Sequence, residues 1–150
     1  MVYMFNFKSI LVMGNVLAML LIGLSLSFSE DSSEFVVYKS FIKAGTTSFV
    51  QSQFKEQSYI DTKNINSTIK ASEVIQLMRQ SYRRKIRQQK ISEISFAAEL
   101  SVHGEKHYLV FCLPNRIYDL SENCSYIINE DGIEIVQKWY NKLLQCGLEY

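Results

Sequence analysis

The first 29 residues constrain the chain most, because they combine a single charge, Lys8, with a long apolar run. The run extends from Ile10 to Phe28 and is interrupted only by glycine, asparagine and serine. A basic start, an apolar stretch and the small-residue exit Ser27-Phe28-Ser29 are typical of a secretory signal peptide. At about 18 or more apolar residues, the run is also long enough for an uncleaved membrane anchor. We favour cleavage, and both interpretations predict an exported protein, periplasmic or otherwise extracytoplasmic in the first case and held in the inner membrane in the second.

Residues 30–150 are expected to form a single globular domain, since about 120 residues is a common domain size. All 15 acidic residues and every basic residue except Lys8 lie in this part, so it is formally neutral. Nucleic-acid binding requires a basic surface, and we therefore expect no nucleic-acid partner. Contact with a membrane is expected only through residues 1–29, if they remain uncleaved.

Three cysteines, Cys112, Cys124 and Cys146, lie in the predicted exported domain. Oxidising compartments favour disulfides, so the sequence predicts one disulfide and one remaining thiol. Each of the three pairings is open. Buried reduced thiols are expected only if the chain is not exported.

Apolar periodicity predicts a mainly α fold. A helix is expected to begin at Glu34 after a serine cap. The strongest helical pattern covers about 67–90 and has one apolar stripe. A short helix over about 120–129 and a final helix over 133–146 complete the prediction. We therefore expect a small helical domain stapled by a disulfide and preceded by the N-terminal signal or anchor helix.

Residues 91–113 fit two interpretations. Their apolar side chains alternate, as in a half-buried strand, but a subset also recurs at helical spacing. In the strand interpretation, His103-Gly104-Glu105-Lys106 is a hairpin turn. The alternative to the mainly α fold is therefore an α+β fold with a hairpin at 93–113.

His103 and His107 are four residues apart, a spacing at which two helical histidines can share a metal ion. Gly104 weakens such a helix and stands where the zinc-protease pattern has glutamate. Cys112 could pair with either histidine as a nucleophile, but its apolar neighbours predict burial. The sequence also has no phosphate loop and no serine elbow. We therefore expect no metal site, no cofactor, no catalytic residue and no enzymatic activity.

Arginines are concentrated near the end of the predicted 67–90 helix. Arg79, Arg83 and Arg87 are one helical turn apart, and Arg84 is next to them in sequence. Such a cluster either forms a solvated face that complements the helix dipole or attracts an acidic surface. These four arginines are the candidate partner-binding residues.

One stretch resembles a known family. Ala98-Glu-Leu-Ser101-Val102-His-Gly104, followed by Phe111-Cys112-Leu-Pro114, resembles the Ala-x-x-Tyr-Val-x-Gly … Phe-Cys-x-Pro core of the Rap/Tai class of type VI secretion immunity proteins. This sequence has Ser101 where the family has tyrosine. The resemblance, over residues 98–146, implies a small, mostly helical, disulfide-containing periplasmic protein that binds and blocks a toxin.

Two functions are consistent with these patterns. The first is a non-enzymatic exported inhibitor, such as an immunity protein, that sterically blocks a secreted toxin. The alternative is an accessory or structural subunit of an envelope or secretion assembly, held by residues 1–29. Retention of residues 1–29 in the mature protein would favour the second.

Overall fold

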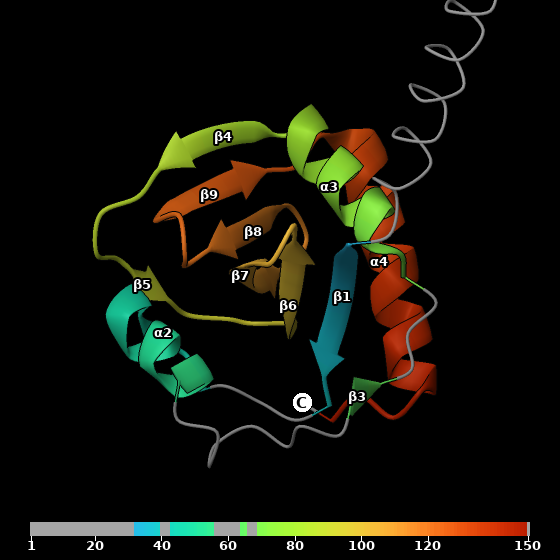
Figure 1. Cartoon of the computed structure of the whole chain (residues 1–150), viewed down its shortest axis with the longest axis horizontal. Helices are drawn as coiled ribbons and strands as arrows, with labels where there is room; N and C mark the ends of the chain where they lie inside the picture. The colour runs from blue at the N-terminus through green and yellow to red at the C-terminus, as the bar shows by residue number, and fades with distance from the viewer. Residues whose placement is uncertain (1–31, 40–42, 56–63, 66–68, 150) are drawn as a thin grey trace, which may run out of the picture. The chain divides into compact units, whose positions relative to one another are not determined.

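The computed structural model describes residues 32–39, 43–55, 64–65 and 69–149. Within these residues, seven strands form one antiparallel sheet in the order β3-β1-β6-β7-β8-β9-β4, and β2 pairs with β5 separately (Figure 1). The strands are β1 (Ser33–Tyr38), β2 (Gly45–Thr46), β3 (Asn64–Ile65), β4 (Tyr82–Lys85), β5 (Lys90–Ile91), β6 (Phe96–Val102), β7 (Glu105–Cys112), β8 (Arg116–Asp119) and β9 (Cys124–Ile127). The helices are α2 (Thr47–Lys55), α3 (Ala71–Gln80) and α4 (Glu130–Gln145).

The prediction of a mainly α fold is wrong, and the segment after Glu34 shows why. It forms β1 rather than a helix, because the run Phe35-Val36-Val37-Tyr38 consists of aromatic and β-branched side chains that suit a strand. Val37 lies opposite Ala98 of β6, so β1 is fixed by pairing with a segment distant in sequence. The expected short helix at 120–129 is also absent, since a turn and β9 occupy these residues.

The predicted 67–90 helix is correct only for its central part. Helix α3 covers Ala71–Gln80 and buries Val74, Leu77 and Met78. The helix ends at Ser81, whose backbone is extended. Ser81 donates its backbone N–H to the Met78 carbonyl and its hydroxyl to the Leu77 carbonyl. The arginine-rich continuation then pairs with β9 as β4. Tertiary pairing therefore overrides the high intrinsic helix propensity of arginine and lysine here.

The hairpin of the alternative fold is present, as β6 and β7. Phe96 pairs with Phe111 at one end and Val102 with Glu105 at the other. The two loop residues, His103 and Gly104, have φ of 51° and 84°. Two positive φ values are the signature of a type I′ turn, whose twist matches that of the flanking strands.

The predicted final helix is confirmed as α4, although it begins earlier, at Glu130. Its cap is Asn129, whose side-chain oxygen accepts the Gly132 backbone N–H at 2.9 Å. Val136, Trp139 and Leu143 are buried on its inner face. Gly147 has φ of 96° and ends the helix, while Leu148 donates its backbone N–H to Leu143.

Helices cover both faces of the sheet (Figure 1). Helices α3 and α4 pack on one face, around Phe96 and Phe111, whose rings stack with centroids 4.2 Å apart. Helix α2 packs on the other, where Phe54 stacks on Tyr108 at 4.9 Å. We call these the α4 face and the α2 face. Neighbouring residues of a strand alternate between them, so the strand register decides which side chains meet.

The predicted disulfide is wrong, because Cys112, Cys124 and Cys146 are all free. Cys112 packs against the core of the α2 face. Cys124 lies opposite Asp119 of β8, and Asp119 in turn lies opposite Leu109 of β7. Because Leu109 packs in the core of the α4 face, Cys124 belongs to that face as well. Cys146 is exposed beyond α4. Since a disulfide requires β-carbons about 4 Å apart, side chains on opposite faces cannot form one.

Alkylation should distinguish the three thiols. Burial raises the pKa of Cys112 to about 12, so almost none of it is thiolate at neutral pH. Cys124 is fully buried. We expect iodoacetamide to label Cys146 in the folded protein and all three cysteines after denaturation, as read by peptide mass spectrometry. Labelling of Cys112 or Cys124 at the rate of Cys146 would contradict this burial.

The predicted leader, residues 1–29, lies outside the described residues, so the structure does not test its signal or anchor role. Among the helices that are described, none combines the length and apolar character needed to cross a bilayer.

Candidate functional site

A basic pocket lies on the α2 face, beside edge strand β4. Antiparallel pairing places Arg84 opposite Ser125 and Arg116 opposite Ile127. Arg84 comes from β4 and Arg116 from β8, with β9 between them in the sheet. Two arginines separated by more than thirty positions in the chain therefore share one surface.

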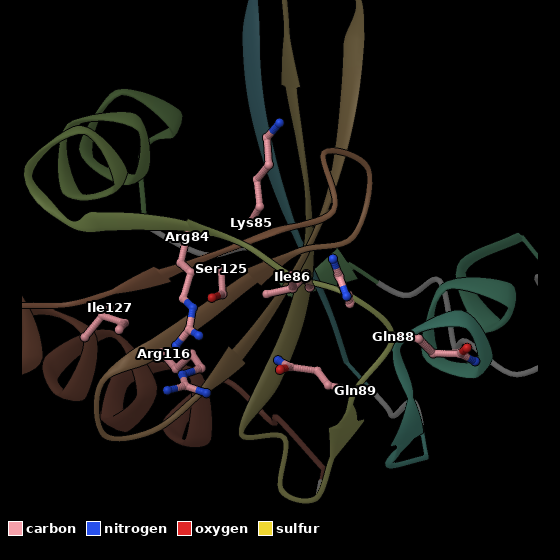
Figure 2. Close-up of a pocket in the computed structure, with 9 residues that line it drawn as sticks. Arg84, Lys85, Ile86, Gln88, Gln89, Arg116, Ser125 and Ile127 are labelled. Atoms are coloured by element: carbon pink, nitrogen blue, oxygen red, sulfur yellow. The ribbon is translucent and has the colours of Figure 1, made fainter.

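The pocket has a volume of about 360 Å³. Its walls come from the ends of β4, β8 and β9 and from the segment that leads from β4 to β5 (Figure 2). The residues that line it are Arg84, Lys85, Ile86, Arg87, Gln88, Gln89, Arg116, Ser125 and Ile127. Figure 2 shows Arg84 extending toward Arg116, whereas the Lys85 side chain points away from both.

Hydrogen-bond donors dominate the polar groups of this lining. Three arginines contribute guanidinium groups, and no carboxylate, histidine or cysteine belongs to the described residues that line the pocket. The Gln89 side-chain nitrogen Nε2 is buried and has no hydrogen-bond partner among the described residues. A buried donor without a partner costs about 1–3 kcal/mol. A negatively charged group in the pocket would satisfy such a donor and offset the repulsion between the arginines.

Arg116 is held in place by its neighbour Tyr118. Its Nη1 donates to the Tyr118 hydroxyl at 3.3 Å, and its Cζ lies 5.9 Å from the centroid of the ring. This contact restricts the guanidinium before any ligand arrives, which lowers the entropy lost on binding. Arg116 is therefore the best positioned cation of the pocket.

The four arginines predicted to bind a partner do not form one surface. Arg84 and Arg87 line the basic pocket. Arg83 has the opposite orientation along β4 and contacts Cys124 and Glu122 on the α4 face. Arg79 is exposed in the last turn of α3. The helical spacing that grouped them fails because the chain becomes a strand after Gln80.

Sequence reasoning missed Arg116 and Gln89, which complete the pocket. Neither is close to the arginine cluster in a helical projection. The stretch Arg116-Ile-Tyr-Asp119, which follows the Pro114-Asn115 turn, has polar residues at both ends and apolar ones between them. This pattern is a weak indication that Arg116 lies on a short strand. Placing it beside Arg84 also requires the pairing of β4 with β9, and one sequence does not supply that.

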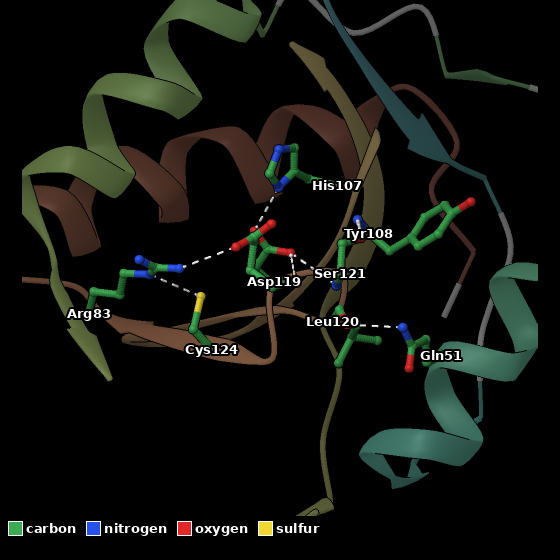
Figure 3. Close-up of polar contacts among 9 residues, drawn as sticks. Gln51, Arg83, His107, Tyr108, Asp119, Leu120, Ser121 and Cys124 are labelled. Atoms are coloured by element: carbon green, nitrogen blue, oxygen red, sulfur yellow. Dashed lines mark hydrogen bonds and ion pairs between the residues drawn. The ribbon is translucent and has the colours of Figure 1, made fainter. Parts of the chain in front are cut away.

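A second polar cluster occupies the α4 face around Asp119, a fully buried carboxylate (Figure 3). Its Oδ2 lies 2.9 Å from Nδ1 of His107, and its Oδ1 accepts the backbone N–H groups of Ser121 and Glu122, both at 3.1 Å. These bonds hold the turn between β8 and β9, in which Asn123 has φ of 51°. The cluster therefore has a structural explanation.

Arg83 closes this second cluster from the edge strand. Its Nε donates to the Cys124 sulfur at 3.4 Å, and its Nη2 lies 3.5 Å from Oε2 of Glu122. The hydrogen bond to the Cys124 sulfur raises the pKa of Arg83, which stays a cation. Arg83 is thus already paired with a carboxylate within the protein, whereas among the described residues no carboxylate pairs with Arg84, Arg87 or Arg116.

The two histidines do not meet at one site. His103 lies in the type I′ turn, and His107 lies in β7 against Asp119. Across the part of the chain that the structure describes, no three His, Cys, Asp or Glu side chains are grouped so as to hold a metal ion.

No protein-family model, curated protein or solved structure matches this chain. The function must therefore be inferred from the residues of the pocket and of the strand beside it.

Proposed function

We propose that this protein is a non-enzymatic exported binding protein that holds an acidic surface of a partner protein in the basic pocket. The observation that carries the proposal is the donor-rich lining, in which three arginines surround a space with a buried amide nitrogen that has no partner among the described residues. Such a lining attracts carboxylates, and its described residues include no histidine, carboxylate or cysteine. Binding is therefore better supported than catalysis.

An inhibitor of a secreted toxin is the form of this function that we favour. A steric inhibitor needs a preformed surface, and the pocket is built on paired strands, with Arg116 fixed by Tyr118. The helical fold implied by the resemblance to immunity proteins is not the fold of this chain, so the proposal rests on the pocket. Arginine-rich contact with an acidic face also gives fast association and selects against basic partners.

Photo-crosslinking from the pocket tests the proposal. A benzophenone amino acid replaces Gln88, an exposed residue at the pocket, in the full-length protein made in its own cells. The matched control places it at Gln137, which is exposed on α4. We expect irradiation to trap a protein with an acidic surface from position 88 only, and Arg116→Glu to abolish that adduct. No adduct at position 88, or equal adducts from both positions, would refute the proposal.

A further inference from the structure

Strand β4 is the outermost strand of the large sheet and is bordered by the basic pocket. Among the strands that the structure describes, β4 pairs with β9 alone. All of its residues, Tyr82–Lys85, are exposed, and Tyr82 is 69% accessible. An open, exposed edge of this kind offers backbone groups to a further strand.

The hydrogen-bond register shows which backbone groups face the open edge. Ile86 donates its N–H to the Asn123 carbonyl at 3.0 Å, and this pair continues the register in which Arg84 lies opposite Ser125. Hydrogen-bonded and non-hydrogen-bonded pairs alternate along an antiparallel ladder. Arg84 is therefore bonded to β9, whereas the N–H and C=O groups of Arg83 and Lys85 point outward.

No other described segment occupies these outward groups. No backbone hydrogen bond from another described segment reaches the amide of Arg83 or of Lys85. Together the two residues present two donors and two acceptors at the spacing of a ladder. An added antiparallel strand could use all four.

The charge of β4 determines which kind of strand can pair with its open edge. The edge sequence Tyr82-Arg83-Arg84-Lys85 has three adjacent cations. A second copy of β4 would place like charges opposite one another, which is destabilising. An acidic strand would instead place carboxylates opposite Arg83 and Lys85 on one face and opposite Arg84 on the other. Since opposed side chains are about 5 Å apart, a carboxylate opposite Arg84 would meet the Arg84 side chain at the rim of the basic pocket, on the side of β4 away from β8 and Arg116.

We propose that the open edge of β4 accepts an extended acidic segment of the partner protein as an additional antiparallel strand, with alternate carboxylates on the α2 face, where one meets Arg84 at the rim of the basic pocket. This inference rests on the proposed function, because it specifies how the partner binds beside the same pocket. Backbone pairing would supply the geometry, and Arg84, on the edge strand itself, would supply the selectivity for acidic side chains.

Two substitutions at one position isolate the backbone contribution. Lys85→Pro removes the ammonium and the outward N–H, whereas Lys85→Thr removes the ammonium only. Neither alters the bonds of β4 to β9, since Lys85 points its amide away from β9. The probe is a short fluorescent peptide of alternating glutamate and threonine, titrated by anisotropy against full-length protein. We expect Lys85→Pro to weaken binding by about tenfold more than Lys85→Thr does.

A pair of modified peptides gives the same test without changing the protein. One carries N-methyl groups on the amides that would face β4, and the other carries them on the opposite edge. We expect the first to lose about tenfold or more in affinity and the second to bind like the unmodified peptide. Equal effects of the two methylations, together with equal effects of the two Lys85 substitutions, would overturn the added strand.

The outcomes separate this inference from the proposed function. Failure of the acidic peptide to bind, while position 88 still traps an acidic protein, overturns the added strand and leaves the proposed function intact. Loss of both peptide binding and the position 88 adduct refutes both.

Discussion

Replacing Arg116 by glutamate is expected to weaken binding of the acidic partner by about a hundredfold. The substitution removes the guanidinium that Tyr118 holds in place and introduces a carboxylate that pairs with Arg84 and repels the partner. Loss of one member of a close interfacial charge pair costs about 2–5 kcal/mol, and a hundredfold corresponds to about 2.7 kcal/mol. The dissociation constant for the protein trapped at position 88, measured by calorimetry, checks the effect.

The matched control is Arg79→Glu, which changes the net charge by the same amount. Arg79 is exposed on α3 and does not line the pocket. We expect it to change the dissociation constant by about threefold or less, because exposed cations outside an interface act mainly through screened long-range attraction. Equal losses for Arg79→Glu and Arg116→Glu would mean that net charge, rather than the pocket, governs binding.

Replacing Asp119 by alanine is expected to lower the free energy of unfolding by about 3 kcal/mol. Its fully buried carboxylate accepts the backbone N–H groups of Ser121 and Glu122 and contacts His107. Alanine leaves those two donors of partly buried hydrogen bonds without their acceptor, and each unsatisfied group costs about 1–3 kcal/mol when it is kept from water. Urea denaturation followed by tryptophan fluorescence measures the loss, since Trp139 packs in the core of the α4 face.

Two controls distinguish this mechanism from a general effect of mutation. Asp119→Asn keeps one acceptor oxygen for the turn and should cost about 1 kcal/mol. Glu122→Ala removes an exposed ion pair with Arg83 and should cost about 1 kcal/mol or less. An Asp119→Ala protein as stable as Glu122→Ala would contradict the role of Asp119 in holding the β8–β9 turn.

Part of the fold follows from local sequence. Helix α4 is predictable because Val136, Trp139 and Leu143 recur at helical spacing and Gly147 ends the helix. The β6–β7 hairpin is available as an alternative because Gly104 allows a positive φ. The β1 and β4 strands are not predictable in this way, because each depends on pairing with a segment that a helical pattern does not reveal.

The sequence predicts two residues of the pocket, Arg84 and Arg87, as partner-binding residues. The helical spacing groups them with Arg79 and Arg83, which the structure places elsewhere. Along a strand, adjacent residues alternate between faces, so Arg83 and Arg84 separate. Arg116 enters the pocket only through the register of β9 with β4 and β8.

The most direct test of the pocket as the binding site follows the arginine side-chain Nε–H signals by NMR. The full-length protein is titrated with the partner trapped at position 88. We predict that the signals of Arg84 and Arg116 shift together and saturate, while that of Arg79 stays in place. An unchanged Arg116 signal at saturating partner, or an Arg79 signal that shifts with the same midpoint, would contradict the assignment of the pocket.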